Sequence, residues 1–369
     1  MPKKYTLQFA EWSWQEYQYM LLSLIKDFIS PLKMELAKIF PVSEIIVTNS
    51  ARGALIEVLV QLKEKNTHKT HVLVSEYICP SVLDAIKSAG LEPVSVAMNS
   101  DLNISATVVE ENICESTLAV IGVHMCSKPC DIQVLENICK RKGVILIDDA
   151  AQLGFGNMSK NYGAYGDFGL ISFAQSKSIV TGVRGSGGVL LINNDKYKNI
   201  LNLPLLQSKD RWLQFFYFLL AYKYSHIFGK LVYYYARLKA KLKIAAPEFY
   251  QLSQISNIEA SIALAQYQSI ENRVARKTRL LEQFNKKLIS SNEFSIPQFE
   301  KGIYLSKLLI KTPLDVQAVR KKIASQGVQT RSAYPGFDSY FEIPFHSKMS
   351  DTDVVSICNI LKSVDLNKE

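Results

Sequence analysis

The chain has 369 residues, of which 48% are hydrophobic and 21% are charged, and this composition excludes an intrinsically disordered protein. Its 17 glycines and 12 prolines are too few for a collagen-like or low-complexity chain. Lys and Arg outnumber Asp and Glu by 43 to 34, and the resulting net charge of +9 favours anionic partners such as phosphates, acidic lipid surfaces or nucleic acid.

Hydrophobic periodicity predicts the elements of the first two hundred residues. Residues 16–40 have helical spacing, with a break expected at Pro31. Strands are then expected at 45–47, 71–74, 94–96, 118–123, 144–147, 170–173 and 189–192, with helices at 54–62, 81–89 and 131–141. This alternation predicts an α/β fold built of right-handed βαβ units around a mostly parallel sheet flanked by helices. Ligands of such sheets bind beyond the carboxyl ends of the strands.

The remainder of the chain has a different pattern. A stretch rich in aromatic residues runs over 212–235, and a helix is expected at about 256–288. The last eighty or so residues alternate between helix and strand, which is typical of a small α+β domain. We therefore predict a large domain over 1–250, with an aromatic and basic insertion at 205–248, and a smaller C-terminal domain over 251–369.

The six cysteines are scattered, and the first residues, Met-Pro-Lys-Lys-Tyr, do not have the pattern of an export signal. Cys126 and Cys130 have the wrong spacing for a CxxC zinc motif, so no metal site is expected. We interpret the cysteines as reduced, mostly buried thiols of a cytoplasmic protein.

Three features could carry chemistry, although each has an ordinary structural explanation when taken alone. Asp148 and Asp149 follow the strand 144–147 and could cap a turn. Lys177 could be one surface lysine among many, and the glycine-rich run 181–188 lacks the Gly-Lys-Ser/Thr ending of a P-loop. Taken together, a carboxylate facing a lysine at the mouth of an α/β sheet, with a serine and a helix N-terminus to hold phosphate, is what pyridoxal phosphate requires.

The order of these motifs resembles a known family. IDDAAQLG (147–154) followed by GDFGLISFAQSK (166–177) is similar to the DegT/DnrJ/EryC1/StrS family of sugar aminotransferases, which are fold-type I pyridoxal-phosphate enzymes acting on nucleotide-linked keto-sugars. The segments 49–55, 77–82, 122–126 and 343–353 fit the family in the same register. The resemblance covers about residues 40–200 well and 255–365 more loosely.

The resemblance implies roles for three residues around the cofactor ring. Lys177 would form the Schiff base and shuttle protons, and Asp149 would pair with the pyridinium nitrogen. Gln152 would hydrogen-bond the phenolic oxygen of the ring. Some relatives carry His in place of this lysine and act as dehydratases, so lysine at position 177 favours transamination.

The resemblance also implies phosphate contacts from Ser172 and from the backbone N–H groups of Arg52 and Gly53. Cys79 occupies the position where the family often has an aromatic residue that stacks on the ring. Tyr77 is the alternative stacking residue, and the sequence does not decide between the two.

Substrate contacts are less well marked. Arg331 and Tyr334 are candidates to bind the nucleotide-linked sugar, although an exposed arginine is equally well explained as a surface charge. The family's loop whose Asn reaches the cofactor phosphate of the neighbouring subunit aligns with residues 250–254, and Leu252 there cannot make that contact. The expected activity is amino transfer from an amino acid, with glutamate as donor. The alternatives are a pyridoxal-phosphate-dependent dehydratase or epimerase and a catalytically silent scaffold or regulatory protein.

The insertion has two interpretations. Phe215, Phe216, Phe218, Leu219 and Tyr222, followed by Arg237, Lys239, Lys241 and Lys243, could lie at an anionic membrane surface. The alternative, which we favour, is that the same aromatic residues of 212–243 pack against the second subunit of a homodimer. Nucleic-acid binding is not expected, because no recognisable module accompanies the charge.

Overall fold

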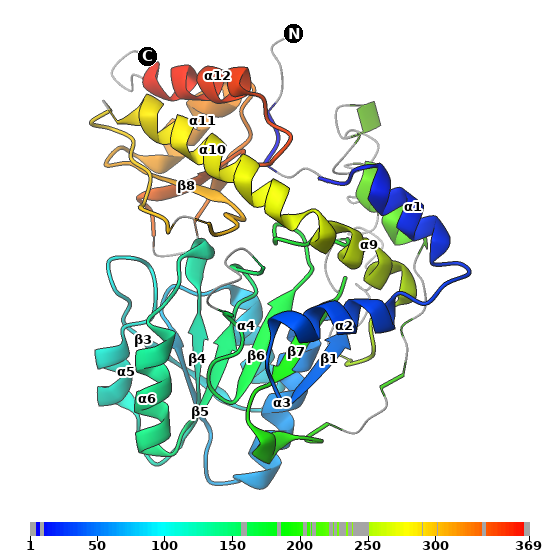
Figure 1. Cartoon of the computed structure of the whole chain (residues 1–369). Coiled ribbons are helices and arrows are strands. Elements are labelled where there is room, and N and C mark those ends of the chain that lie inside the picture. The colour runs from blue at the N-terminus through cyan, green and yellow to red at the C-terminus, as the bar shows by residue number, and fades with distance from the viewer. Residues whose placement is uncertain are drawn as a thin grey trace.

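The computed structural model describes residues 5–7, 11–155, 161–182, 186–201, 205–206, 208, 212–220, 224, 227–228, 234, 238, 251–289, 291–300, 302–333 and 337–364. Within these ranges the chain forms a seven-stranded sheet covered by helices and, beside it, a smaller three-stranded sheet (Figure 1).

The larger sheet has the strand order β1-β7-β6-β5-β4-β2-β3. Its strands are β1 (Glu44–Thr48), β2 (His71–Ser75), β3 (Glu92–Val96), β4 (Thr117–Val123), β5 (Ile145–Asp149), β6 (Phe168–Ser172) and β7 (Gly188–Ile192). The run from β6 through β5, β4 and β2 to β3 is parallel, whereas β7 pairs antiparallel with both β6 and β1. The predicted mostly parallel α/β sheet is confirmed.

Helices cover both faces of this sheet. One face packs against α3 (Ala51–Lys65) and α4 (Pro80–Ser88); the other packs against α2 (Ile29–Ile39), α5 (Ala106–Asn112), α6 (Ile132–Lys142) and α9 (Asn257–Gln268). Ile145 and Ile147 of β5 join the core on the α3 side, and Leu146 between them joins the core on the α6 side. Burial on both faces explains why the strands are continuous hydrophobic runs rather than alternating ones.

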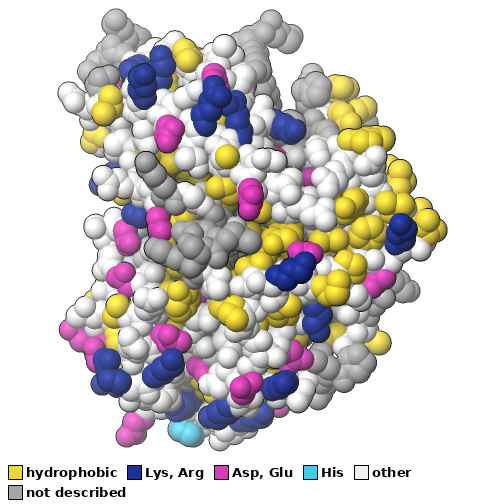
Figure 2. Space-filling view, in the orientation of Figure 1, with side chains coloured by type: hydrophobic (Ala, Val, Ile, Leu, Met, Phe, Trp, Pro, Cys, Tyr) yellow, Lys and Arg dark blue, Asp and Glu magenta, His cyan; other side chains and the backbone are white. Residues whose placement is uncertain are grey.

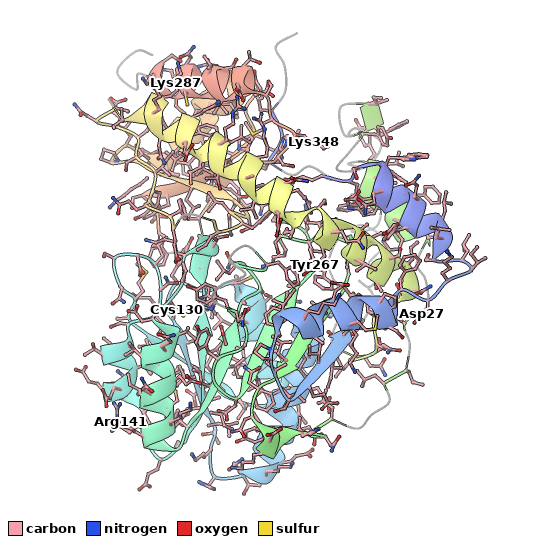
Figure 3. All side chains as sticks on the ribbon, in the orientation of Figure 1. Asp27, Cys130, Arg141, Tyr267, Lys287 and Lys348 are labelled. Carbon is pink, nitrogen blue, oxygen red and sulfur yellow. The ribbon has the colours of Figure 1, made fainter. Side chains whose placement is uncertain are left out.

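The smaller sheet is antiparallel, with the order β8-β10-β9. Its elements are β8 (Leu308–Lys311), α11 (Val316–Ser325), β9 (Arg331–Ser332), β10 (Tyr340–Ile343) and α12 (Asp351–Lys362). The helix α10 (Ile270–Leu288) runs from the larger part to the smaller one, where Leu280, Phe284 and Leu288 join its core (Figure 1). Figure 3 places Lys287 and Lys348 in this smaller part and Arg141 at the far end of the larger one. The domain boundary predicted after residue 250 stays a prediction.

Two predicted helical segments, one of them with a break expected at Pro31, each form two helices. The segment 16–40 forms α1 (Trp14–Leu22) and α2, and Pro31 lies in the first turn of α2 rather than at the break. Proline is tolerated there because the first N–H groups of a helix have no acceptor within it. The segment 256–288 divides into α9 and α10 at Ser269, whose hydroxyl donates to Gln266 O over 3.1 Å.

The aromatic segment is partly internal, which corrects our expectation that its aromatic residues lie at a membrane surface or against a second subunit. Phe215, Phe218 and Leu219, in and just after α7 (Trp212–Phe218), are buried against Trp12 and against α1 and α9 of the same chain. Phe216 is exposed, whereas Tyr222 and residues 239–243 lie outside the described residues. None of the helices in the described part of the chain is long and hydrophobic enough to cross a membrane.

A buried ionic cluster joins the N-terminal segment, α10 and the smaller part. Glu11 lies 3.5 Å from Arg273 Nε and 3.6 Å from Lys277 Nζ. Ser347 donates its N–H to Glu11 Oε1 over 3.1 Å and its hydroxyl to Oε2 over 2.6 Å, and the Tyr304 hydroxyl donates to Oε2 over 3.4 Å. Burial raises the pKa of Glu11, but the two cations and Ser347 outweigh it and lower the pKa from 4.5 to about 2.

We expect Glu11→Gln to lower the free energy of unfolding by about 3–5 kcal/mol at pH 7, because it leaves two buried cations without their carboxylate. Since the folded pKa is below the unfolded one, the carboxylate stabilises the fold above pH 4.5, and this contribution is lost as the pH falls towards 2. Chemical denaturation of both proteins between pH 7 and pH 3 should therefore show the difference shrinking. Glu35→Gln, at a surface ion pair with Lys38, is the control and should cost less than about 1 kcal/mol; equal losses for the two variants would contradict the assignment.

Candidate active site

A cavity of about 550 Å³ opens beyond the carboxyl ends of the parallel strands. It is bordered by the segment after β2, the end of β4 at Val123, the turn after β5 and the segment after β6. Helix α4 connects β2 to β3 on one face of the sheet, and α6 connects β4 to β5 on the other. The cavity therefore lies where the direction of winding reverses, which is where open α/β sheets bind ligands.

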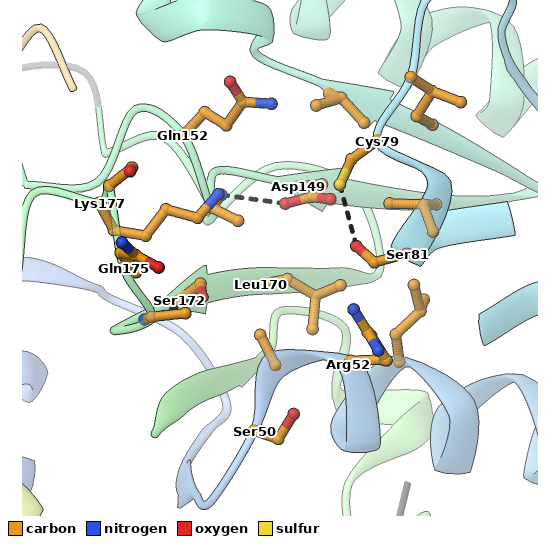
Figure 4. A pocket seen from close by; sticks show the side chains of 18 of the residues that line it. Ser50, Arg52, Cys79, Ser81, Asp149, Gln152, Leu170, Ser172, Gln175 and Lys177 are labelled. Atoms are coloured by element: carbon orange, nitrogen blue, oxygen red, sulfur yellow. Dashed lines mark hydrogen bonds between the residues drawn. The ribbon is translucent and has the colours of Figure 1, made fainter. Parts of the chain in front are cut away.

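Lys177 and Asp149 face each other in this cavity. The dashed line in Figure 4 joins the Lys177 amine to the Asp149 carboxylate, whose Oδ1 also accepts the N–H of Ala151 over 2.9 Å. Burial lowers the pKa of Lys177, and the ammonium of Lys307 lowers it further, while Asp149 acts in the opposite direction. Burial raises the pKa of Asp149, although Ala151 and Lys177 oppose this. A lowered pKa favours the neutral, nucleophilic form of the Lys177 amine.

A second pair of side chains, His124 and Asp148, lies next to Asp149 and is buried. His124 Nε2 and Asp148 Oδ1 are 2.8 Å apart, and both side chains are fully buried. Asp148 Oδ2 accepts the N–H of Gly163 over 2.6 Å, and the N–H of His124 donates to Asp149 O over 3.3 Å. Because Cys130 donates its N–H to His124 Nδ1 over 3.0 Å, the proton lies on Nε2 and is donated to Asp148. The two consecutive aspartates thus differ in their surroundings: Asp148 is hydrogen-bonded within the core, and Asp149 lines the cavity.

Gln152 lies beside Lys177 and Asp149 (Figure 4). Its Oε1 accepts the N–H of Cys126 over 3.1 Å, which directs Nε2 away from that backbone. Nε2 lies 3.2 Å from Met125 Sδ, a weak acceptor. The amide can therefore donate to an oxygen bound in the cavity.

The opposite end of the cavity is built from β6, β7 and the start of α3. Ser172 lines it and is paired with Gly188 across the sheet. A side chain on Gly188 would come within 2.8 Å of Ala51 N, so glycine there lets β7 approach the helix N-terminus. The N–H groups of Ala51 and Arg52 have no acceptor within the helix and border the cavity with Ser172.

The predicted phosphate contact from Gly53 is not in this lining. Ser50 caps α3, and its Oγ accepts the Gly53 N–H over 3.3 Å. The cap side chain therefore accepts the N–H that the family resemblance assigned to a phosphate, and the residues of α3 that border the cavity are Ala51 and Arg52. This difference of one residue depends on the position at which α3 begins, and the resemblance did not specify that position.

Of the two candidates to contact the cofactor ring, Cys79 lines the cavity. Its Sγ lies 3.1 Å from Ser81 Oγ, as marked in Figure 4. Tyr77 is buried outside the lining, with its ring edge-on to Phe337 at a centroid distance of 4.1 Å. Four of the six cysteines are buried, whereas Cys79 is half-buried and Cys114 is exposed.

The predicted substrate contacts have different outcomes. Arg331 lines the cavity from β9, with its side chain 48% exposed and its Nη1 3.6 Å from Glu342 Oε2. Tyr334 lies outside the described residues. Lys307, which precedes β8, also lines the cavity and was missed. No local pattern marks Lys307, because only the packing of the smaller sheet on the larger part brings it to Lys177.

These residues fit pyridoxal phosphate. The amine of Lys177 faces the buried carboxylate of Asp149, and Gln152 offers an amide donor. Ser172 with the first N–H groups of α3 forms the end suited to a phosphate. These contacts come from three segments (the start of α3, the end of β5 with the turn after it, and the end of β6 with the residues after it), and all of them line one cavity.

Comparison with known proteins agrees with this site. The model of the DegT/DnrJ/EryC1/StrS aminotransferase family matches residues 26–356. GDP-perosamine synthase of Escherichia coli O157:H7 is 25% identical over 277 residues, covering 72% of this chain and 65% of that enzyme, which is just under two thirds of its length. The GDP-perosamine synthase of Caulobacter vibrioides is 23% identical over 288 residues, covering 78% and 67%.

Solved structures share the fold. The Helicobacter pylori aminotransferase PseC, involved in pseudoaminic acid biosynthesis, superposes with a TM-score of 0.78 at 14% identity over 98% of both chains. An Escherichia coli GDP-4-keto-6-deoxy-D-mannose-3-dehydratase with bound hydrated pyridoxal phosphate superposes with a TM-score of 0.75 at 14% identity, covering 98% of this chain and 100% of that one. From its site and the family match, the chain is a pyridoxal-phosphate-dependent aminotransferase and belongs to the DegT/DnrJ/EryC1/StrS aminotransferase family.

Proposed function

We propose that the enzyme moves an amino group from an amino acid, with glutamate as the donor, to the keto group of a nucleotide-linked sugar for amino-sugar or surface polysaccharide synthesis. The observation that carries the proposal is the Lys177 amine facing the buried Asp149 in a cavity that cations line. Arg52, Lys307 and Arg331 line this cavity, which suits a substrate that carries phosphates. Relatives named GDP-perosamine synthase support the same substrate class.

The chain's own residues would divide the work as follows. Lys177 would hold the cofactor and, once released by the donor, its neutral amine would move the proton between the reacting carbon and the cofactor. Asp149 would hold a proton at the ring nitrogen, so that the bound cofactor acts as an electron sink. Gln152 would orient the ring through its phenolic oxygen. Asp149 is buried and Lys177 is half-buried, which limits the competition of water for these contacts.

Two alternatives differ in what they require of Lys177. A dehydratase or an epimerase would use the same cofactor without leaving a donor's amino group on the sugar, and a dehydratase shares the fold. A silent scaffold would have no use for a lysine with a lowered pKa opposite a buried carboxylate. The amine at position 177 therefore favours amino transfer over both.

Amino transfer predicts two linked half-reactions. Glutamate added to enzyme loaded with pyridoxal phosphate should bleach the absorption band of the lysine-bound cofactor and release one 2-oxoglutarate per site. A keto-sugar nucleotide should then restore the band and gain an amino group, which mass spectrometry of a substrate panel would detect. Retention of the band with every common amino donor would contradict amino transfer, and a keto-sugar that loses water without receiving nitrogen would favour the dehydratase.

We also propose a cytoplasmic homodimer with the active site near the subunit boundary. Hydrophobic side chains gather on the right-hand side of Figure 2, where α1 lies in Figure 1, and Trp14, Leu21, Leu24 and Ile25 are exposed there. Exposed hydrophobic surface of this kind is typical of an interface. Light scattering that finds a stable monomer at micromolar concentration would contradict the dimer.

Contact with an anionic membrane through 212–243 is the alternative use of the insertion, supported by the exposed Phe216 and by the basic residues that follow in the sequence. Co-sedimentation that requires anionic vesicles, and that weakens when Arg237, Lys239, Lys241 and Lys243 are changed to Gln, would support it. Equal and negligible binding to neutral and anionic vesicles would contradict it.

A further inference from the structure

Lys307 reaches the active site from the smaller part of the molecule, and so far it has been counted only as one of the cations that line the cavity. It immediately precedes β8 and lines the cavity together with Lys177, Asp149 and Gln152. Its ammonium lies close enough to lower the pKa of the Lys177 amine. A cation so close to the reacting amine attracts an anion that enters the cavity.

The backbone beside Lys307 is fixed by a buried chain of hydrogen bonds. Ser306 donates its N–H to Ser127 Oγ over 3.1 Å, and the two hydroxyl oxygens are 3.0 Å apart. Ser127 in turn donates its hydroxyl to Gln152 O over 2.8 Å. Gln152 belongs to the turn that follows Asp149. These hydrogen bonds therefore connect the start of β8, through Ser127, to the side of the cavity at which we expect the cofactor.

A second anchor fixes the same backbone from the other side. Lys277, buried in α10, donates to Leu305 O over 2.9 Å and lies 4.2 Å from the centre of the Tyr304 ring. Residues 304–306 are therefore held between α10 and the turn at Gln152, and Lys307 follows directly. An ammonium on so constrained a backbone has the preorganisation expected of a substrate contact rather than of a solvated surface lysine.

We propose that Lys307 binds the α-carboxylate of the amino donor. The inference rests on the proposed function, because it requires that an amino acid react at Lys177. In any α-amino acid the α-carboxylate is bonded to the carbon that carries the reacting nitrogen, so it must lie close to the Lys177 amine. The phosphates of a nucleotide-linked sugar are separated from the keto carbon by part of the sugar ring and lie further out.

Arg331 is placed for that outer position. It lines the same cavity from β9, its side chain is half exposed, and it lies at the edge of the smaller sheet. Lys307 and Arg331 would thus serve the two substrates separately, Lys307 the donor and Arg331 the phosphates of the acceptor. Under this division, a residue of the smaller part of the molecule, Lys307, would determine which amino donor binds.

The test compares Lys307→Gln, Lys307→Arg and Arg331→Gln in enzyme loaded with pyridoxal phosphate. The dissociation constant of glutamate is read from the bleaching of the lysine-bound cofactor band, and KM is measured for glutamate and for the keto-sugar nucleotide. Lys307→Gln should weaken glutamate binding about 10- to 100-fold while changing the KM of the sugar nucleotide less than about threefold. Lys307→Arg should recover most of the loss, and Arg331→Gln should show the opposite selectivity.

A donor without the α-carboxylate gives an independent readout. We expect 4-aminobutyrate to react with the wild type more weakly than glutamate does, and Lys307→Gln to remove most of this preference. Wild type that reacts with glutamate while Lys307→Gln binds it equally well would overturn this inference alone. Lys307→Gln that weakens only the sugar nucleotide would assign Lys307 to the phosphates and overturn it too. Wild type that reacts with no amino donor would overturn the proposed function together with the inference.

Discussion

Replacing Lys177 with alanine should abolish the absorption band of the lysine-bound cofactor and lower the rate of amino transfer by roughly 10³-fold or more. The amine at this position faces Asp149 in the cavity, so the alanine variant lacks the group that we expect to form the covalent bond. Noncovalent binding of pyridoxal phosphate should persist, because the contacts of Ser172 and the start of α3 are unchanged. Spectrophotometry and equilibrium dialysis on the same sample separate these two effects.

Lys177→Arg is the matched variant for this experiment. It keeps a positive charge opposite Asp149, but an arginine is never deprotonated in proteins and supplies no nucleophile. Both variants should therefore lack the band, whereas Lys140→Ala, at an exposed lysine of α6, should leave it unchanged. A band that survives in Lys177→Ala would place the covalent bond on another lysine and contradict the assignment.

Changing Asp149 to asparagine should lower kcat for amino transfer by about 10²- to 10³-fold with the cofactor still bound. Asparagine keeps the shape of the side chain but cannot balance a proton on the ring nitrogen, so the cofactor becomes a weaker electron sink. The hydrogen bond from Ala151 to Asp149 Oδ1 can still form with the amide oxygen, which limits structural change. Steady-state kinetics with cofactor occupancy measured in parallel separates a loss of chemistry from a loss of binding.

Asp84→Asn provides the control, since it removes one negative charge from the same cavity at an exposed position on α4. We expect it to change kcat less than about threefold. Equal effects of the two substitutions would show that the total charge of the cavity matters more than the position of Asp149, and would contradict its assigned role.

The sequence predicted the larger sheet well for a physical reason. Its central strands are buried on both faces, so each is a short continuous hydrophobic run, such as 118–123 and 144–147, bounded by polar residues. Asp149 is the last residue of β5, and Lys177 lies in the segment that follows β6. Both could therefore be proposed from the sequence, because a strand end and the turn after it are local features.

What the sequence did not predict depends on contacts between distant segments. Lys307 comes to the cavity through the Ser306–Ser127–Gln152 hydrogen bonds, which join residues 179 positions apart. Phe215 is buried against Trp12, and the sequence pattern of neither segment indicates that the two segments pack together. The outcome at Gly53 depends on a single capping hydrogen bond.

The most direct test of the central claim is to locate the cofactor on the chain. The purified enzyme is incubated with pyridoxal phosphate, reduced with borohydride so that the link to lysine becomes permanent, digested, and analysed by tandem mass spectrometry. Our account predicts a phosphopyridoxyl group on Lys177 at about one per chain. A modification confined to other lysines, Lys307 included, or the same labelling in denatured protein as in folded protein, would contradict it.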